Sequence, residues 1–154
     1  MTSRLAIFIP ALAAILSPSL ALAEAPAIEK IRSYLIFEDT GDVTEDITDL
    51  PEQIVANDEH GQSVQMSIDV VLRGKAGQLY ENNPVLHVVT RPSLPEAADA
   101  VNQTFPIAFM AKENLYRSVI VDHNCNGFEF EAYVMDGGKR VSEFKKNFSI
   151  TCGD

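Results

Sequence analysis

Carboxylates are the side chains whose density most suggests chemistry in this sequence, and they gather in one stretch. Nine of the 22 acidic residues lie between Glu38 and Glu59, where no lysine or arginine occurs. Ca²⁺ takes about six to eight oxygen ligands, mostly from carboxylates and carbonyls, so a dense acidic segment is a calcium-site candidate. The segment DTGDVTEDITD lacks the ligand spacing of an EF-hand loop but still supplies four candidate ligands. They are Asp39, Asp42, Glu45 and Asp46.

A solvated loop and a docking surface are two further interpretations of the same stretch. A loop of this charge stays in water without any ligand, whereas complementary potentials would draw in a cationic protein and speed the encounter. We expect an exported, non-enzymatic binding domain with a cationic protein partner. The alternative is a calcium-binding or carboxylate-based hydrolytic enzyme of the periplasm. The expected partner-binding residues are Glu38, Asp39, Asp42, Glu45, Asp46 and Asp49.

A second pair of carboxylates raises the question of glycoside hydrolysis, which needs two such groups roughly 5–9.5 Å apart. Glu129 and Glu131 are two residues apart, so on a strand they share one face. They alternate with Phe128, Phe130 and Ala132, so we expect both carboxylates to face solvent. No G-x-S-x-G nucleophile elbow, phosphate-binding loop or dinucleotide fingerprint occurs, and no cofactor is expected.

Cys125 and Cys152 are the only cysteines, and an even number favours a disulfide in an exported chain. The bridge would close a loop of 28 residues and stabilise the fold by roughly 3.5 kcal/mol on the chain-entropy model. A reactive thiol is the alternative, because His123 lies two residues from Cys125 and would share a strand face with it. Zinc is not expected, since its sites use four ligands at characteristic spacings that are missing here.

Residues 1–23 have the order of a cleaved secretory signal peptide. Arg4 precedes an apolar run, and Ala21 and Ala23 are the small residues that a signal peptidase needs. The run is shorter than the roughly 20 apolar residues that span a bilayer, and prolines interrupt it. We therefore expect cleavage near Ala23, no membrane anchor in the mature chain, and one domain, residues 24–154, that is periplasmic or secreted.

The charge balance excludes one large class of partner. The 154 residues carry a formal net charge of −10, and removal of the expected signal leaves 131 residues with a charge of −11. Phosphate backbones repel such a chain, so nucleic-acid binding is not expected. Hydrophobic residues make up 46% of the sequence, which is enough to form one packed core.

Alternation of apolar and polar residues predicts that strands must position these groups. The clearest alternation runs from Val64 to Leu72, and the other expected strands cover 31–37, 85–90, 105–109, 115–122, 128–134 and 144–152. Helix is scarce. Ser93 and Glu96 match a capping box and predict a short helical turn over Pro95–Val101, and apolar spacing predicts another around Pro51.

The last two strands can be aligned from their apolar faces. Both sets face one side if Phe128 lies opposite Phe148 and Ala132 lies opposite Phe144. This register predicts a three-residue loop, residues 137–139. It also turns Cys125 away from its expected partner, so a bulge at residues 126–127 is predicted to turn it back.

About seven short strands and one disulfide predict an all-β, antiparallel, immunoglobulin-like β-sandwich with one or two short helical turns. The final segment reads YRSVIVDHNCNGFEFEAYVMDGGKRVSEFKKNFSITCGD. Its cysteine near the penultimate strand and its terminal Cys-Gly-acid resemble the end of small exported bacterial one-disulfide proteins with an immunoglobulin-like sandwich. The resemblance covers roughly the last 40 residues. It implies the fold and no particular activity, because those proteins have no established one.

Overall fold

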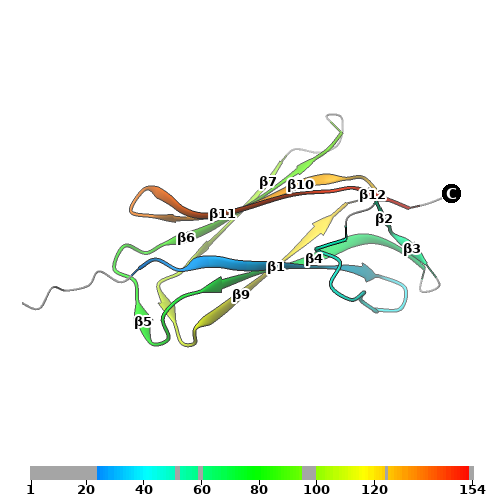
Figure 1. Cartoon of the computed structure of the whole chain (residues 1–154). Coiled ribbons are helices and arrows are strands. Elements are labelled where there is room, and N and C mark those ends of the chain that lie inside the picture. Colours follow the sequence, from blue (N-terminus) through cyan, green and yellow to red (C-terminus); the bar gives the residue numbers. More distant parts are fainter. Residues whose placement is uncertain (1–23, 51–52, 59–60, 95–99, 124, 153–154) are drawn as a thin grey trace, which may run out of the picture.

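The protein folds into two layers of β-strands (Figure 1). The computed structural model describes residues 24–50, 53–58, 61–94, 100–123 and 125–152. Its strands are β1 (Ala27–Phe37), β2 (Ile54–Val55), β3 (Asn57–Asp58), β4 (Gly61–Arg73), β5 (Gln78–Leu79), β6 (Val85–Pro92), β7 (Val101–Pro106), β8 (Phe109–Met110), β9 (Asn114–Asp122), β10 (Phe128–Asp136), β11 (Lys139–Phe148) and β12 (Ile150–Thr151). Five of the strands predicted from alternation are present as single strands. The predicted strand 105–109 is wrong as a unit, because β7 ends at Pro106 and β8 begins at Phe109, and the predicted strand 144–152 is divided between β11 and β12.

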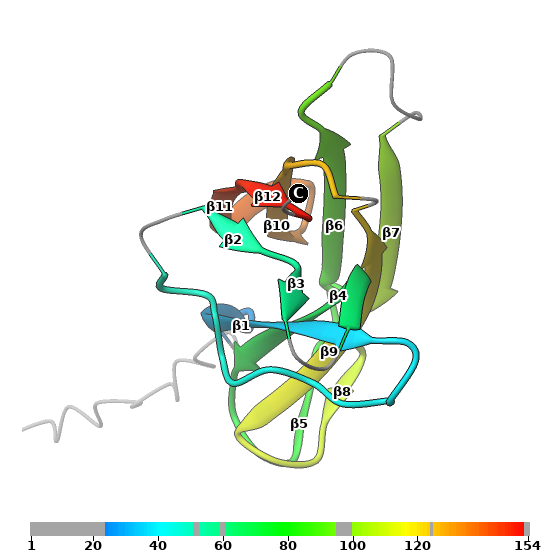
Figure 2. The same ribbon diagram turned by 90° about the vertical axis from the view of Figure 1, so that its right-hand side faces the viewer.

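Two four-stranded sheets form the layers. In the first sheet β4 pairs with β1 on one side and with β9 on the other, and the short β3 also pairs with β4. The second sheet has the order β11-β10-β6-β7, and every pairing in both sheets is antiparallel. Two smaller pairs, parallel β2 with β12 and antiparallel β5 with β8, lie beside them (Figure 2).

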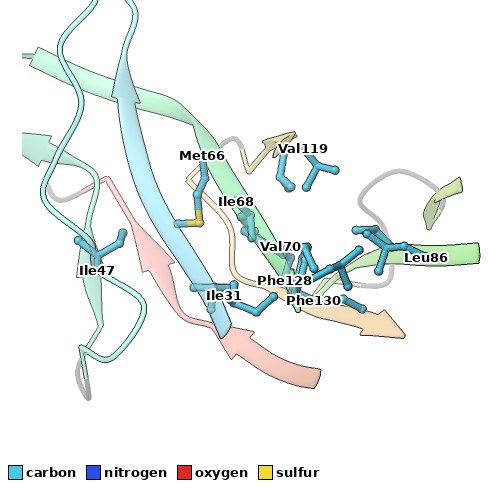
Figure 3. Packing of buried hydrophobic residues seen from close by; sticks show 14 of the residues in the cluster. Ile31, Ile47, Met66, Ile68, Val70, Leu86, Val119, Phe128 and Phe130 are labelled. Carbon is cyan, nitrogen blue, oxygen red and sulfur yellow. The ribbon is translucent and has the colours of Figure 1, made fainter. Parts of the chain in front are cut away.

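The core lies between the sheets and is built from the apolar positions of the alternating strands (Figure 3). Met66, Ile68 and Val70 of β4 are fully buried, as are Phe130 and Leu86 of the facing sheet. Burying a side chain of this size contributes about 1.5–3 kcal/mol to folding. The strand with the clearest alternation, β4, is also the central strand of the first sheet, because it pairs with β1 and with β9.

The predicted helical turns are not seen in the part of the chain that the structure describes. Ile47 and Leu50 are joined by one hydrogen bond of 3.2 Å across a simple turn, while Pro51 itself lies outside the described residues. Residues 95–99 of the expected Pro95–Val101 turn also lie outside them, and Val101 already belongs to β7. The described fold is thus all-β.

The final hairpin has the predicted register but a shorter loop. Phe128 pairs with Phe148 and Ala132 with Phe144, as expected from the apolar faces. The prediction of a three-residue loop is wrong, because Asp136 pairs with Lys139 and leaves two residues, 137–138, at the turn. A register shift beyond Val134 absorbs the extra residue on β11. The glycines at 137 and 138 have φ values of 53° and 78°, as a two-residue type I′ loop requires.

Among the residues that the structure describes, no helix is long and apolar enough to cross a membrane. The predicted signal peptide, residues 1–23, lies outside the part of the chain that the structure describes.

Candidate functional site

The acidic stretch does not hang free from the sheet but folds back along the outer edge of β1 (Figure 2). The backbone N–H of Phe37 donates to the Asp42 carbonyl at 2.9 Å, and that of Ile47 donates to the Ser33 carbonyl at 2.9 Å. Thr44 N–H donates to the Leu35 carbonyl at 3.2 Å. We call residues 38–49 the acidic edge segment. It occupies backbone groups that an uncovered edge strand would offer to another chain.

Two side chains of the acidic edge segment complete this cover. Thr44 Oγ1 accepts a hydrogen bond from the Leu35 N–H at 3.0 Å, and Asp46 Oδ1 accepts one from the Ser33 N–H at 3.2 Å. Asp46 Oδ1 also accepts from the Thr48 hydroxyl at 2.6 Å and from the Thr48 N–H at 3.0 Å. Burial by itself raises the pKa of Asp46, but the hydrogen bonds from Thr48 and Ser33 outweigh it and lower that pKa.

The remaining predicted partner-binding side chains point outward. All five are exposed, namely Glu38, Asp39, Asp42, Glu45 and Asp49. The other acidic residues of the stretch, Glu52 and Glu59, lie outside the described residues. Asp46 is exposed as well, but its Oδ1 is engaged at the β1 edge, whereas its five neighbours form an outward-facing array.

The four candidate calcium ligands are not drawn together. Within the described ranges, no group of three or more histidine, cysteine, aspartate or glutamate side chains is placed to hold a metal ion. Asp46 Oδ1 already accepts three hydrogen bonds from Ser33 and Thr48. Calcium binding would need the segment to leave the β1 edge or to move its carboxylates.

Glu131 lies on the outer face of the second sheet but is covered by cations. It is only 3% exposed, so the expectation that it faces solvent is wrong. Its Oε2 accepts a hydrogen bond from Arg91 Nη2 at 3.0 Å, and its Oε1 accepts one from Arg140 Nη1 at 2.8 Å. Lys145 Nζ lies 3.4 Å from Oε1. Side chains from β6 and β11 thus close over a carboxylate on β10.

The electrostatics of Glu131 oppose acid catalysis. Burial by itself raises the pKa of Glu131, but the hydrogen bonds from Arg91 and Arg140 and the charge of Lys145 lower it below its ordinary value. A general acid in glycoside hydrolysis needs the opposite shift. Glu129, its presumed catalytic partner in such a reaction, forms an ion pair with Arg91. The pair therefore acts as part of an ion-pair network on the sheet.

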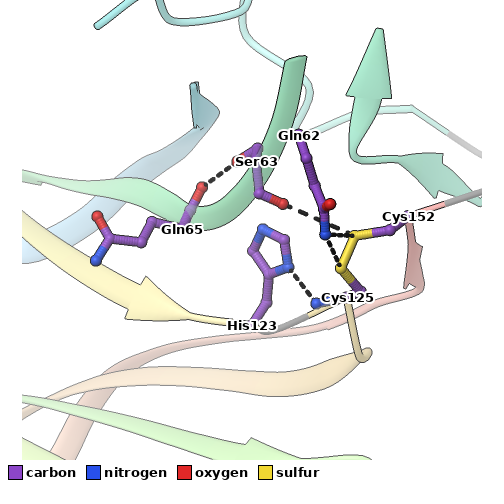
Figure 4. The surroundings of a disulfide bond; sticks show 6 residues. All are labelled: Gln62, Ser63, Gln65, His123, Cys125 and Cys152. Carbon is purple, nitrogen blue, oxygen red and sulfur yellow. Dashed lines mark hydrogen bonds between the residues drawn. A yellow bond between two sulfur atoms is a disulfide. The ribbon is translucent and has the colours of Figure 1, made fainter. Parts of the chain in front are cut away.

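The disulfide joins Cys125 to Cys152, as predicted, and their Cα atoms are 5.1 Å apart (Figure 4). The predicted bulge at residues 126–127 is wrong. Cys125 instead lies in a turn ahead of β10 and itself adopts a positive φ of 61°. Gln62 Nε2 lies over the bridge, 3.1 Å from Cys125 Sγ and 3.2 Å from Cys152 Sγ. Because both sulfurs are bonded, the alternative of a thiol nucleophile at Cys125 is wrong.

His123 lies against the disulfide turn and is buried, with 4% exposed. Its Nδ1 accepts a hydrogen bond from the Cys125 N–H at 3.1 Å (Figure 4). Burial lowers the pKa of His123, and the Gln65 backbone and the Asp122 charge oppose the shift only partly. The neutral imidazole is thus the form that the fold accommodates.

A groove on the side of the molecule formed by β7 and β9 was not predicted from the sequence. It has a volume of about 580 Å³, within the range of about 300–1,000 Å³ that is usual for ligand sites. Its lining includes Val88, Val101, Val119, Val121 and Phe128. Strand alternation does not reveal such a groove, because its walls come from two different sheets. The order of strands in each sheet depends on long-range pairing, which a local sequence pattern does not predict.

Comparison with known proteins gives this chain no family, since no protein-family model matches it and no curated protein does. The resemblance of the last 40 or so residues to small exported one-disulfide proteins therefore stays a prediction. The function has to follow from the residues and their geometry.

Proposed function

We propose that the protein is an exported, non-enzymatic binding domain that engages a cationic protein partner through the acidic edge segment. One observation carries the proposal: five exposed carboxylates project from a backbone that is hydrogen-bonded to β1. A backbone that is already ordered loses less conformational freedom when a partner binds. The array therefore differs from a solvated acidic loop, which would have to be ordered first.

Charge complementarity gives the partner its chemistry. From Ser33 to Leu72 the sequence contains no lysine or arginine, and His60 is its only histidine. Negative potential of this kind steers basic partners and raises association rates at low salt. A basic protein is the partner that this surface selects.

The proposed fold is an immunoglobulin-like sandwich. Among the strands that the structure describes, seven are longer than two residues. The first, second and fifth of these form one sheet, and the other four form the second. The constant-type immunoglobulin arrangement differs from this order only in the sheet that holds the fourth strand. Here the fourth strand, β7, pairs with β6. Such sandwiches present loops and edges for binding, and a single disulfide suits an oxidising compartment.

The test is capture of a partner from an extract of the source cells by the mature protein, residues 24–154, on a resin. Glu38→Lys with Glu45→Lys removes charge from the array and leaves Asp46 at the β1 edge. Glu81→Lys with Glu113→Lys changes the net charge equally at exposed positions outside the segment. Expected is a basic protein that the wild type and the control retain and that the first variant loses, with and without a calcium chelator.

Equal capture by all three proteins would contradict the proposal, as would capture that disappears in both variants alike. Loss of capture only when the chelator is present would instead favour the calcium alternative. Mass spectrometry of the protein from its natural host tests export, since cleavage near Ala23 is expected and an uncleaved chain would oppose it.

A further inference from the structure

The two seams between the sheets differ. On one side, the Ile28 N–H donates to Ser142 Oγ across the seam at 3.0 Å, and the acidic edge segment covers β1. On the other side, β7 pairs only with β6 and β9 pairs only with β4 among the described strands. These two strands end their sheets and border the same groove. One seam is therefore covered, and the other has two strand edges beside a groove.

The groove is lined by both apolar and polar side chains, and the polar ones are Thr90, Gln103, Asp122, His123 and Asn126. Val119 and Val121 form the wall on the β9 side, with Val88 and Phe128 between the sheets. The rim residues Val101 and Ile120 are 51% and 50% exposed. Exposed apolar side chains that continue into a groove are typical of an interaction site.

Next to the groove, the same face of β9 carries an arginine with a buried atom that has no hydrogen-bond partner in the described structure. Arg117 pairs with the inward-facing Val70 of β4, so it shares the inner face of β9 with Val119 and Val121. Arg117 Nε is buried without a hydrogen-bond partner in the described structure. Along the inner face of β9 and the residue after it, two valines lie between two polar side chains, in the order Arg117, Val119, Val121 and His123. An inward-pointing charge on an edge strand ordinarily deters a further strand.

We propose that this groove binds an extended polypeptide segment of a partner protein, added as a strand to the free edge of β9. A strand satisfies backbone N–H and C=O groups of the edge, which a lipid or another small apolar molecule cannot do along its length. Its inward side chains repeat every two residues, as those of β9 do. Two of them are apolar and lie over Val119 and Val121, and the next is a carboxylate that meets Arg117. This site is separate from the acidic edge segment.

Arg117 sets the specificity of the proposed site. A strand with a lysine at the position opposite Arg117 would bring like charges together beside a partly buried side chain, which disfavours the wrong partner. A strand with a glutamate there would form a charge-assisted hydrogen bond. The inward arginine therefore admits one class of strand and rejects others.

The test uses seven-residue peptides with capped termini. Threonine stands at the odd positions, valine at positions 2 and 4, and either glutamate or lysine at position 6. The reversed sequences are included, because an added strand can run either way. Affinities are measured by calorimetry, and the binding site is mapped by amide chemical shifts of the mature protein. The wild type should bind a glutamate peptide at least tenfold more tightly than its lysine counterpart, with shifts confined to β9, β7 and the groove.

Substitution of the arginine provides the sharper readout. Arg117→Glu should reverse the preference between the two peptides, and Arg117→Gln should abolish it if the reversed charge prevents folding. Lys112→Glu makes the same charge change at an exposed position outside the groove and should leave the preference intact.

Several results would overturn the proposal. The proposal is wrong if neither peptide binds at millimolar concentration or if both bind with equal affinity. Chemical shift changes along β1 and β11 would also contradict it. Uptake of a fatty acid without either peptide would make the groove a small-molecule site. Self-association through β9 in sedimentation would make its occupant a second copy. Because the variants leave the acidic edge segment unchanged, failure here is distinct from failure of the proposed cationic-partner surface.

Discussion

At the scale of single residues, the fold withdraws ionisable side chains from water and in doing so fixes their protonation. Glu131 lies beneath Arg91, Arg140 and Lys145, and these cations hold it ionised. His123 is buried beside the disulfide, and its burial favours the neutral ring. Both effects make the stability of the protein depend on pH, in windows that the direction of each pKa shift determines.

Replacing Glu131 by glutamine should destabilise the protein by about 1–3 kcal/mol at pH 7, because three cations lose a buried, charged acceptor. The pKa of Glu131 is lower in the folded protein than in the unfolded chain. Its stabilisation is therefore present above about pH 4.5 and is lost as the pH falls through the folded value. Urea denaturation across pH 3–7 measures this, and the difference between wild type and Glu131→Gln should shrink toward pH 3.

The matched control for this prediction is Glu143→Gln, which removes an exposed carboxylate that also pairs with Arg140. Its effect should stay below about 1 kcal/mol, as is usual for exposed pairs. A Glu131→Gln protein as stable as wild type at pH 7 would contradict the account of the covered carboxylate.

His123 gives a second pH dependence, in a higher window. Below about pH 6.5 the unfolded chain takes up a proton at this residue while the folded protein, whose pKa is lowered, does not. The free energy of unfolding should therefore fall between pH 7 and pH 5, by up to about 1.4 kcal/mol for each unit by which the pKa is lowered. His123→Asn keeps an acceptor for the Cys125 N–H and should lack this fall in urea denaturation. Equal slopes for the two proteins would contradict the burial of a neutral ring.

At the scale of elements, the acidic edge segment combines two properties that the sequence alone does not relate. Its carboxylate density is plain in the sequence, but its attachment to β1 depends on Thr44 and Asp46 reaching backbone groups of another strand. Among the predicted binding residues, Asp46 takes part in that attachment through a side-chain hydrogen bond to β1. The segment is therefore both an edge cover and an outward acidic array.

Asp46→Ala should destabilise the protein by about 1–3 kcal/mol, because the Ser33 N–H and the Thr48 groups lose their acceptor. Asp49→Ala, at an exposed position of the same segment, should change stability by about 0.5 kcal/mol or less. Urea denaturation compares the two, and hydrogen exchange should show faster exchange at Ser33 only in the first variant. Similar stability of both variants would argue against the edge cover.

The turn of the final hairpin provides a separate prediction. Both residues of the two-residue loop have positive φ. A β-carbon makes this conformation unfavourable for most residues, but asparagine is common at the first position of such a loop when glycine follows. Gly138→Ala should cost about 1–2 kcal/mol in unfolding free energy, whereas Gly137→Asn should be close to neutral. If denaturation shows both substitutions to be harmless, the loop is longer or looser than the two residues described.

Local signals predicted much of this element structure, and their failures have a common cause. Alternation along Val64–Leu72 found the central strand, and the facing phenylalanines found the register of the last hairpin. Alternation also assigned Glu131 to the outer face, but its burial depends on cations that other strands bring over it. The loop length was wrong because a register shift on β11 leaves the apolar pairing unchanged.

At the scale of the whole molecule, the order in which strands join the sheets decides where partners can bind. The first and last long strands, β1 and β11, meet at a seam that a hydrogen bond and the acidic edge segment cover. The opposite seam between β7 and β9 contains the groove, and Arg117 lies on the same inner face of β9 as the valines of its wall. Neither arrangement could be predicted from the sequence, because strand order arises from long-range pairing and not from any local pattern.

The salt dependence of partner binding tests the central claim most directly, since the proposed surface works by charge. The dissociation constant of the captured basic protein is measured between 50 and 300 mM salt for the wild type, for Glu38→Lys with Glu45→Lys, and for Glu81→Lys with Glu113→Lys. Screening should weaken binding by about tenfold or more for the wild type and the control. The first variant should bind weakly at every salt concentration. Affinity that is insensitive to salt and equal for all three proteins would contradict the claim that the acidic edge segment binds a cationic partner.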